Sequence, residues 1–345
     1  MTTAAPLLPA LAARVRAAAH SGTRLCRSCN ADASVDASAS ASASASAAAN
    51  ATANAGAGAA DTDAATLADR PDGTVVRHGD VVAKAHAPGT DQGALAHRLA
   101  LAARLPGVLL PPLAPAAPAD LHGRLVTCWP YGTPVDPDDP AAAPWEAAGA
   151  LLARLHRTPA PAALPLMRGP AKAAAALARL RETAPRHPGT APVLGAWAAL
   201  PAWARGEADM PDTATPCHGD FHLGQLVRHP APAGPWLLID VDDLGRGVPA
   251  WDLARPAAWY ACGLLTSDEW TRFLTAYRAA GGPAVPPDGD PWPALDVPAR
   301  ALTAQTAARA LTKAAAADRS LDDVERALVD ACARMAAVPA RTPGS

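Results

Sequence analysis

The residues that could carry chemistry are gathered between positions 217 and 240 of the 345-residue chain. The segment Cys217-His-Gly-Asp-Phe-His-Leu-Gly-Gln225 holds one acidic residue, Asp220, and the apolar run Trp236-Leu-Leu-Ile leads into Asp240. Phosphoryl transfer to an alcohol needs a carboxylate that orients the hydroxyl and accepts its proton, together with an oxygen ligand for magnesium. Asp220 and Asp240 are of the right residue type for these two tasks.

The spacing around Asp220 supports this assignment. In the protein-kinase loop H-R-D-L-x-x-x-N the metal ligand follows the catalytic Asp by five positions. Gln225 follows Asp220 by the same distance, and His218 precedes it by two. Magnesium takes carboxylate and amide oxygens, so Gln225 and Asp240 are predicted as its ligands, with Asp242 as a further candidate. His218 is grouped with the catalytic residues, where its task would be to hold the loop backbone.

Two motifs together carry a family resemblance. His218-Gly-Asp-Phe-His-Leu-Gly-Gln225, followed by Ile239-Asp-Val-Asp-Asp-Leu-Gly-Arg-Gly-Val-Pro-Ala-Trp-Asp-Leu-Ala254, resembles the catalytic region of aminoglycoside phosphotransferases and their kinase-like relatives. Those enzymes carry an H-G-D-x-x-x-x-N loop, then I-D, then D-L-A. The Gln in the usual Asn position is most similar to the maltokinase-like branch.

The resemblance implies a function and a set of site residues. It makes Asp220 the catalytic base, Gln225 and Asp240 the magnesium ligands, and Asp252 a buried carboxylate that braces the catalytic loop. The implied reaction transfers the γ-phosphate of ATP to a hydroxyl of a small molecule such as a sugar, an amino alcohol or an aminoglycoside-like compound. ATP and Mg²⁺ are the implied cofactors.

A lysine far upstream fits the same scheme. Val81-Val-Ala-Lys84 resembles the V-A-I-K strand whose lysine contacts the α- and β-phosphates of the nucleotide. The chain has three lysines against 27 arginines, so a lysine on this strand favours a task that needs a compact ammonium group. The resemblance also places the interlobe hinge at residues 125–131, where the backbone of Thr127, Cys128 and Trp129 would meet the adenine.

One departure from the family pattern concerns the partner of Lys84. The first glutamate in the chain is Glu146, so the usual glutamate partner of the strand lysine cannot lie in the small lobe. Asp91 could take its place, or Lys84 could serve the phosphates alone.

Composition and pattern predict an α+β, bilobal protein-kinase-like fold. Short β-like runs separated by turn residues occupy 65–68, 74–77, 81–86 and 125–129, and a helix is expected over 91–104. The predicted organisation is a low-complexity, disordered extension over 1–62, a small β-rich lobe over 63–130, a large helical lobe over 131–338 and a flexible tail over 339–345. Residues 7–19 of the extension could form a short amphipathic helix. Further helices are predicted near 140–156, 171–183, 190–205, 249–265, 267–280, 294–317 and 320–336.

Bulk properties restrict the partners and the compartment. A formal net charge of −2 gives no general attraction to nucleic acid or to an anionic membrane, and no run approaches the ~20 apolar residues of a membrane span. The six cysteines are scattered, with one C-x-x-C pair at Cys26 and Cys29, which is typical of a reducing compartment. We therefore expect a cytoplasmic protein whose partner is a small molecule, while the sequence leaves the oligomeric state open.

Two other functions compete with the kinase. The missing glutamate and the Gln at 225 suggest a pseudokinase-like module that binds nucleotide without turnover. His218, Asp220, His222 and Asp240 could instead be the ligands of a metal-dependent hydrolase.

Overall fold

The structure is a computed structural model that describes residues 7–20 and 64–338, and these form two compact units. The first unit takes in the described residues up to Ala143 together with Gly224–Asp242. The second consists of Pro144–Leu223 and the described residues from Asp243 onward. The chain therefore passes between the units three times, twice within the predicted catalytic segment. A mainly antiparallel sheet followed by a mainly helical region confirms the predicted fold class.

The first unit contains a five-stranded antiparallel sheet in the order β1-β2-β3-β5-β4. Its central strand, β3, presents Ala83 and Ala85 on one face and Lys84 and His86 on the other, because successive side chains of a strand alternate. The strands predicted from sequence are all present. The bounds are β1 (Ala65–Arg70), β2 (Gly73–His78), β3 (Val81–His86), β4 (Ala119–Leu121) and β5 (Arg124–Pro130).

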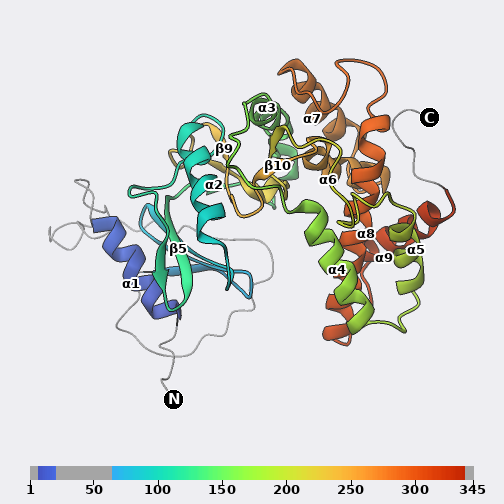
Figure 1. Ribbon diagram of the computed structural model, residues 1–345, viewed down its shortest axis with the longest axis horizontal. Coiled ribbons are helices and arrows are strands. Elements are labelled where there is room, and N and C mark those ends of the chain that lie inside the picture. The colour runs from blue at the N-terminus through green and yellow to red at the C-terminus, as the bar shows by residue number, and fades with distance from the viewer. Residues whose placement is uncertain (1–6, 21–63, 339–345) are drawn as a thin grey trace. The chain divides into compact units, whose positions relative to one another are not determined.

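Helix α1 (Leu7–His20) packs against the face of the sheet that carries Ala83 and Ala85 (Figure 1). Leu11 and Val15 are fully buried there, in one apolar cluster with Val76 and Val126 of the sheet. The prediction of disorder over 1–62 was thus wrong for this segment. Leu11, Val15 and Ala19 recur every four residues and form an apolar stripe along one side of the helix. A helix this short is unstable by itself, and burial of the stripe against the sheet stabilises it. The remainder of the predicted extension, with Cys26 and Cys29, lies outside the described residues.

The rest of the first unit positions two predicted site residues. Strands β6 (Thr133–Pro134), β8 (Leu226–Arg228) and β9 (Trp236–Leu238) form a second sheet in the order β6-β8-β9. Just beyond the β8–β9 pairing, the backbone N–H of Ile239 donates to the carbonyl of Gln225 at 2.9 Å, which places Gln225 beside the residue preceding Asp240. Helix α2 (Gln92–Arg104) begins after Asp91, whose carboxylate accepts the backbone N–H of Ala94 as an N-cap.

The second unit is a helical body with one short strand pair. Its helices pack around an apolar core to which α8 contributes the largest number of buried residues. The predicted helices are all present, but three have shorter bounds than expected: α3 begins at Trp145, α6 ends at Ala261, and α5 ends at Ala198 instead of 205. The end of α5 comes shortly before Pro201, whose ring cannot continue a helix. The bounds are α3 (Trp145–His156), α4 (Gly169–Thr183), α5 (Thr190–Ala198), α6 (Ala250–Ala261), α7 (Ser267–Ala279), α8 (Trp292–Ala316), α9 (Asp323–Ala336), β7 (Thr215–Cys217) and β10 (Gly245–Gly247).

Among the helices of residues 7–20 and 64–338, none combines the length and the apolar character that crossing a membrane requires.

Truncation of one α1 side chain tests whether the helix belongs to the first unit. Leu11→Ala should lower the free energy of unfolding by about 2 to 4 kcal/mol, because a fully buried leucine is lost against the sheet. Leu67→Ala makes the same chemical change at a side chain that is 49% exposed and should cost less than about 0.5 kcal/mol. Urea unfolding of both variants provides the measurement, and equal small effects would show that α1 contributes nothing to stability.

Candidate active site

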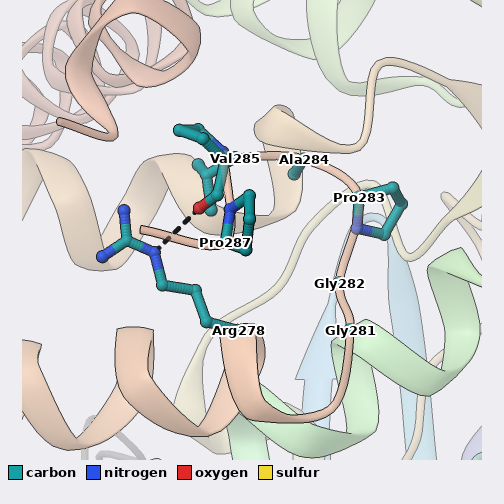
Figure 2. A pocket seen from close by; sticks show the side chains of 8 residues that line it. Arg278, Gly281, Gly282, Pro283, Ala284, Val285 and Pro287 are labelled. Atoms are coloured by element: carbon teal, nitrogen blue, oxygen red, sulfur yellow. Dashed lines mark hydrogen bonds between the residues drawn. The ribbon is translucent and has the colours of Figure 1, made fainter. Parts of the chain in front are cut away.

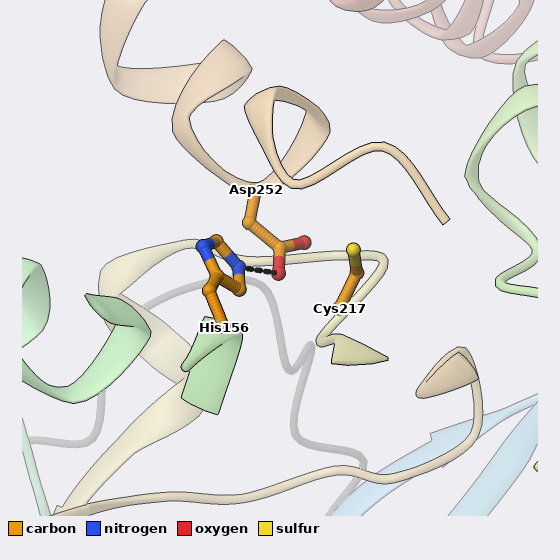
Figure 3. A group of neighbouring side chains, drawn as sticks. All are labelled: His156, Cys217 and Asp252. Atoms are coloured by element: carbon orange, nitrogen blue, oxygen red, sulfur yellow. Dashed lines mark hydrogen bonds and ion pairs between the residues drawn. The ribbon is translucent and has the colours of Figure 1, made fainter. Parts of the chain in front are cut away.

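The predicted catalytic loop is anchored by a buried carboxylate, Asp252, in the first turn of α6. Its Oδ2 accepts the backbone N–H of His218 at 2.5 Å, and its Oδ1 accepts that of Gly219 at 2.7 Å. His156 of α3 adds a third contact from Nε2 to Oδ2 at 2.9 Å (Figure 3). These contacts are those of the brace implied for Asp252, although its role in catalysis stays a prediction. The expected task of the His218 side chain, to hold the loop backbone, stays a prediction.

The brace continues to a loop beyond α7. The Nδ1 atom of His156 lies 2.8 Å from the Tyr277 hydroxyl, and that hydroxyl accepts the backbone N–H of Ala284 at 2.9 Å. Because the hydroxyl accepts from Ala284, its own hydrogen can be donated to His156 Nδ1, which leaves Nε2–H to donate to Asp252. A directed chain of hydrogen bonds thus joins the catalytic loop to the segment after α7.

Gly219 is required by the tight path of the loop. Its φ is +84°, and a Cβ atom at this position would lie 2.3 Å from the carbonyl oxygen of Asp243. Any L side chain would therefore both strain the backbone and displace the neighbouring turn. Gly219, the glycine of the H-G-D motif, therefore lets the loop that carries Asp220 pack directly against the turn that carries Asp243.

Within the described residues, one group of three potential metal ligands lies close together: His156, Cys217 and Asp252 (Figure 3). Both nitrogens of His156 and both oxygens of Asp252 are engaged in the hydrogen bonds of the brace. Burial raises the pKa of the Cys217 thiol well above its ordinary value, so the thiol stays protonated and is a poor ligand. The group is a structural support, and the ligand set of the hydrolase hypothesis does not coincide with it.

Two cations hold Asp220. Lys172 of α4 contacts Oδ2 at 2.8 Å, and Arg255 of α6 contacts Oδ1 at 2.8 Å. Lys172 also reaches Asp243 at 2.6 Å, and Asp243 is buried. Asp243 is therefore an ion-pair partner of Lys172 and does not face solvent.

The ion pairs keep Asp220 ionised. Burial by itself would raise its pKa, but Lys172 and Arg255 outweigh that effect and lower the pKa to about 2. Burial lowers the pKa of Lys172, whereas the charges of Asp243 and Asp220 more than offset it, so the ammonium group stays protonated. The carboxylate is a weak base that can orient a hydroxyl across the whole physiological pH range. Each of its oxygens has two lone pairs, so either can accept a further hydrogen bond.

Positive charge exceeds negative charge around Asp220. Arg168 approaches the carboxylate of Asp243 at 3.8 Å. The pKa of Arg255 is lowered, first by burial and further by the charge of Arg309 on α8. Arg168 and Arg309 thus add positive charge at the edge of the cluster formed by Asp220, Asp243, Lys172 and Arg255.

In the first unit Lys84 is bound to two acids. Its Nζ lies 2.7 Å from Asp240 Oδ1 and 3.0 Å from Asp242 Oδ2. Burial raises the pKa of each of these carboxylates. At Asp240 the charge and hydrogen bond of Lys84 outweigh burial, and at Asp242 the hydrogen bond from His86 and the charge of Lys84 do so, so both pKa values are lowered. Asp240 has a φ of +66°, a left-handed conformation that Asp tolerates better than most residues. Such local strain is characteristic of functional positions.

The residues predicted to bind magnesium suit that ion. Asp240 and Asp242 are ionised carboxylates, and Gln225 is held next to this strand end by its backbone bond to Ile239. Hard oxygen donors of this kind are what magnesium prefers. Gln225 and Asp240 would hold the ion, which supplies positive charge against phosphate oxygens when bound. Asp220 and Asp240 belong to different units, and it stays a prediction that both act on the same bound nucleotide.

The predicted adenine contacts fall on the middle of β5. Thr127, Cys128 and Trp129 pair in register with Lys84, Ala83 and Val82 of β3. The carbonyl of Cys128 accepts the backbone N–H of Leu113 at 2.9 Å, so that oxygen is already engaged. The adenine role of these three residues stays a prediction.

Sequence reasoning missed several residues of the two charge clusters. Lys172 and Arg255 contact Asp220. His86 contacts Asp242, and His156 contacts Asp252. Two signals were present: Lys172 is one of three lysines, and His156 closes the segment L-L-A-R-L-H. The partner suggested for Lys84, Asp91, caps α2 instead.

A cavity of about 570 Å³ lies at the loop after α7, lined by Arg278 and residues 281–287 (Figure 2). The Arg278 guanidinium donates to the carbonyl of Pro286 at 3.0 Å and to that of Gly289 at 2.8 Å, which fixes the loop. The cavity contains none of the predicted site residues. It touches the brace through Ala284, whose N–H binds Tyr277.

The sheet, the helical body and the H-G-D loop define a kinase-like phosphotransferase. Residues 73–296 match the phosphotransferase enzyme family. The match covers more than half of the chain, and the chain belongs to this family, a group of small-molecule kinases with alcohol acceptors. A search of curated proteins found no match.

Solved structures show the same fold at low sequence identity. The choline kinase LicA from Streptococcus pneumoniae is 16% identical with a TM-score of 0.52, over 79% of this chain and 92% of that one. A choline/ethanolamine kinase family protein from Mesorhizobium loti is 19% identical with a TM-score of 0.50, over 79% and 86%. A thermostable mutant of aminoglycoside phosphotransferase APH(4)-Ia, in a ternary complex with AMP-PNP and hygromycin B, is 14% identical with a TM-score of 0.51, over 79% and 94%.

Removal of one hydroxyl tests the brace. Tyr277→Phe should lower the free energy of unfolding by about 1 to 3 kcal/mol, because the Ala284 N–H and His156 Nδ1 lose their shared partner in a buried place. Tyr260→Phe is the matched control, since Tyr260 is half-buried and stacks on the ring of Trp270. Chemical denaturation measures both, and an equal effect of the two substitutions would contradict the directed chain.

Removal of the Lys172 charge tests the electrostatics of Asp220. The pKa of Asp220 lies below its ordinary value of 3.8, so its ionisation stabilises the fold above pH ~4, and this contribution is lost as the pH falls toward 2. Lys172→Met should therefore cost about 2 kcal/mol of unfolding free energy at pH 7, and the difference from wild type should shrink below pH 4. Urea titrations across this range measure it, with exposed Lys313→Met as control. A difference that does not depend on pH would contradict the assignment.

Proposed function

We propose that the chain is an ATP- and magnesium-dependent kinase in which Asp220 orients and deprotonates a hydroxyl of a small molecule. The observation that carries the proposal is an H-G-D loop whose backbone is fixed by buried Asp252 and whose Asp220 is ionised, with a pKa of about 2. Lys84 contacts the nucleotide phosphates in this scheme, and Asp240 with Gln225 supplies the oxygen ligands for the metal.

The weak basicity of Asp220 suits phosphoryl transfer. The transition state is loose in most analyses, with little bond formation to the attacking oxygen, so the hydroxyl needs orientation more than early deprotonation. As the new bond between oxygen and phosphorus forms and the bond to ADP breaks, the hydroxyl proton passes to Asp220 and then to water. Lys172 and Arg255 hold both carboxylate oxygens in place throughout.

The charge around Asp220 bears on the acceptor. Lys172, Arg255, Arg168 and Arg309 outnumber Asp220 and Asp243, so a polycationic acceptor would meet repulsion at the reacting hydroxyl. Among the acceptor types expected from the sequence, this favours a neutral sugar over an aminoglycoside-like compound, and a sugar that carries an acidic group would be tolerated as well.

Turnover with a panel of alcohols tests the function. ADP release with Mg–ATP should rise with a neutral or acidic sugar more than with its amino analogue, for example glucose or glucuronate against glucosamine. With the acceptor found in this way, Asp220→Asn should lower kcat by about 10³-fold and leave the affinity for AMP-PNP unchanged. Asp268→Asn, at a side chain that is 81% exposed, is the control and should behave as wild type.

Two results would contradict the proposal. Normal turnover by Asp220→Asn would exclude Asp220 as the base. Binding of Mg–AMP-PNP without turnover of any alcohol in a broad panel would leave a nucleotide-binding module.

A further inference from the structure

Lys84 has acidic partners although the small lobe contains no glutamate. No glutamate precedes Glu146 in the chain, and Asp91 is committed to the N-terminus of α2. Lys84 instead contacts Asp240 Oδ1 at 2.7 Å and Asp242 Oδ2 at 3.0 Å, all within the first unit. Its acidic partners come from a segment 156 to 158 residues later in the sequence.

Asp242 is held on its other side by His86. The Nδ1 atom of His86 lies 2.6 Å from Asp242 Oδ1, so both oxygens of this carboxylate are engaged. His86 follows Lys84 by two positions on β3, and therefore both side chains lie on the same face of the sheet. The imidazole is almost fully buried, at 1% exposure, which leaves it little freedom to reorient.

A second layer of contacts fixes His86. Its Nε2 atom lies 2.8 Å from the Thr127 hydroxyl, and the indole N–H of Trp129 donates to the same oxygen at 2.8 Å. An ionised carboxylate can only accept, so the hydrogen between His86 and Asp242 belongs to Nδ1. The chain Trp129, Thr127, His86, Asp242, Lys84 is thus a continuous series of hydrogen bonds in a buried part of the first unit.

The two carboxylates next to Lys84 differ in their surroundings. Both oxygens of Asp242 have protein partners, whereas the contacts of Asp240 with Lys84 and with the backbone N–H of Asp242 both use Oδ1. The side chain of Asp240 is also the more exposed, at 33% against 21%. The surroundings therefore separate an anchored acid, Asp242, from one that a metal-bound nucleotide can reach, Asp240.

We propose that Asp242, held by His86, replaces the missing glutamate as the fixed partner of Lys84, and that His86 is a positioning residue for nucleotide binding. The proposal rests on the proposed function, because it assumes that Lys84 contacts the nucleotide phosphates. Under this proposal Asp242 is not a metal ligand. The side chains of Thr127 and Trp129, which were predicted to contact adenine through their backbone, also hold His86 in place. In the sequence, this arrangement corresponds to two short motifs: K-x-H on strand β3 (Lys84 and His86) and D-x-D just after strand β9 (Asp240 and Asp242).

A pair of substitutions at position 86 separates positioning from packing. The Nδ2 atom of asparagine occupies the place of histidine Nδ1, while the Nε2 atom of glutamine occupies the place of histidine Nε2. His86→Asn therefore keeps the donor to Asp242, and His86→Gln loses it. Titration of the full chain with Mg–AMP-PNP should show affinity within about threefold of wild type for His86→Asn and about tenfold weaker for His86→Gln.

A purely structural role predicts the opposite order, because asparagine leaves the larger void. Equal affinities of the two variants, or weaker binding by His86→Asn, would overturn the proposal. Thermal unfolding should confirm that both variants fold. His78→Gln provides the matched control, since His78 is a buried histidine of the same sheet on the face covered by α1, and its affinity should equal that of wild type.

The same titration distinguishes failure of this inference from failure of the proposed function. If wild type does not bind Mg–AMP-PNP, or if Lys84→Met binds it as tightly as wild type, the proposed nucleotide site is wrong and the role of His86 falls with it. If wild type binds, Lys84→Met weakens binding and His86→Gln does not, the nucleotide site stands and the inference about His86 alone is wrong.

Discussion

A carboxylate that is shut off from water must receive hydrogen bonds from the protein, and Asp252 imposes this constraint on the catalytic loop. Removing a charge from water costs several kcal/mol unless donors replace the lost hydration. Here the donors are the backbone N–H groups of His218 and Gly219 and the ring of His156. The loop adopts its path because its backbone N–H groups then supply the hydrogen bonds that water would otherwise give to Asp252. Asp220 is therefore placed by an acid that the proposed reaction never touches.

The same rule governs the two bound lysines. Lys84 bridges Asp240 and Asp242, and Lys172 bridges Asp220 and Asp243. In each case one compact ammonium group satisfies two carboxylates, a geometry that the planar fork of arginine does not reproduce. All four acids lie between positions 220 and 243, and every contact is internal to one unit. Each unit thus pairs its own acids with a lysine before any ligand arrives.

Local patterns in the sequence predicted the parts of the fold that depend on local rules. Alternation and turn residues identified the strands, and apolar periodicity identified the helices of the second unit, although the break before Pro201 was overlooked. Motif spacing predicted Asp220 and Asp240 as site residues, and the family resemblance added Asp252. Contacts between segments far apart could not be derived in this way: Lys172 lies 48 positions before Asp220, and His86 lies 156 before Asp242. The docking of α1 was missed for the same reason, because its stability comes from burial by the sheet.

The position of α1 has a practical consequence for how the chain can be shortened. Residues 73–296 match the family, yet α1 lies before that segment and α9 after it, and both bury apolar surface of the units they belong to. A fragment cut to the family match would leave Val76, Ala83, Ala85 and Val126 facing solvent along one side of the sheet. Contiguous apolar surface of that kind promotes self-association. The stretch recognisable as a phosphotransferase is therefore shorter than the stretch that covers its own apolar surface.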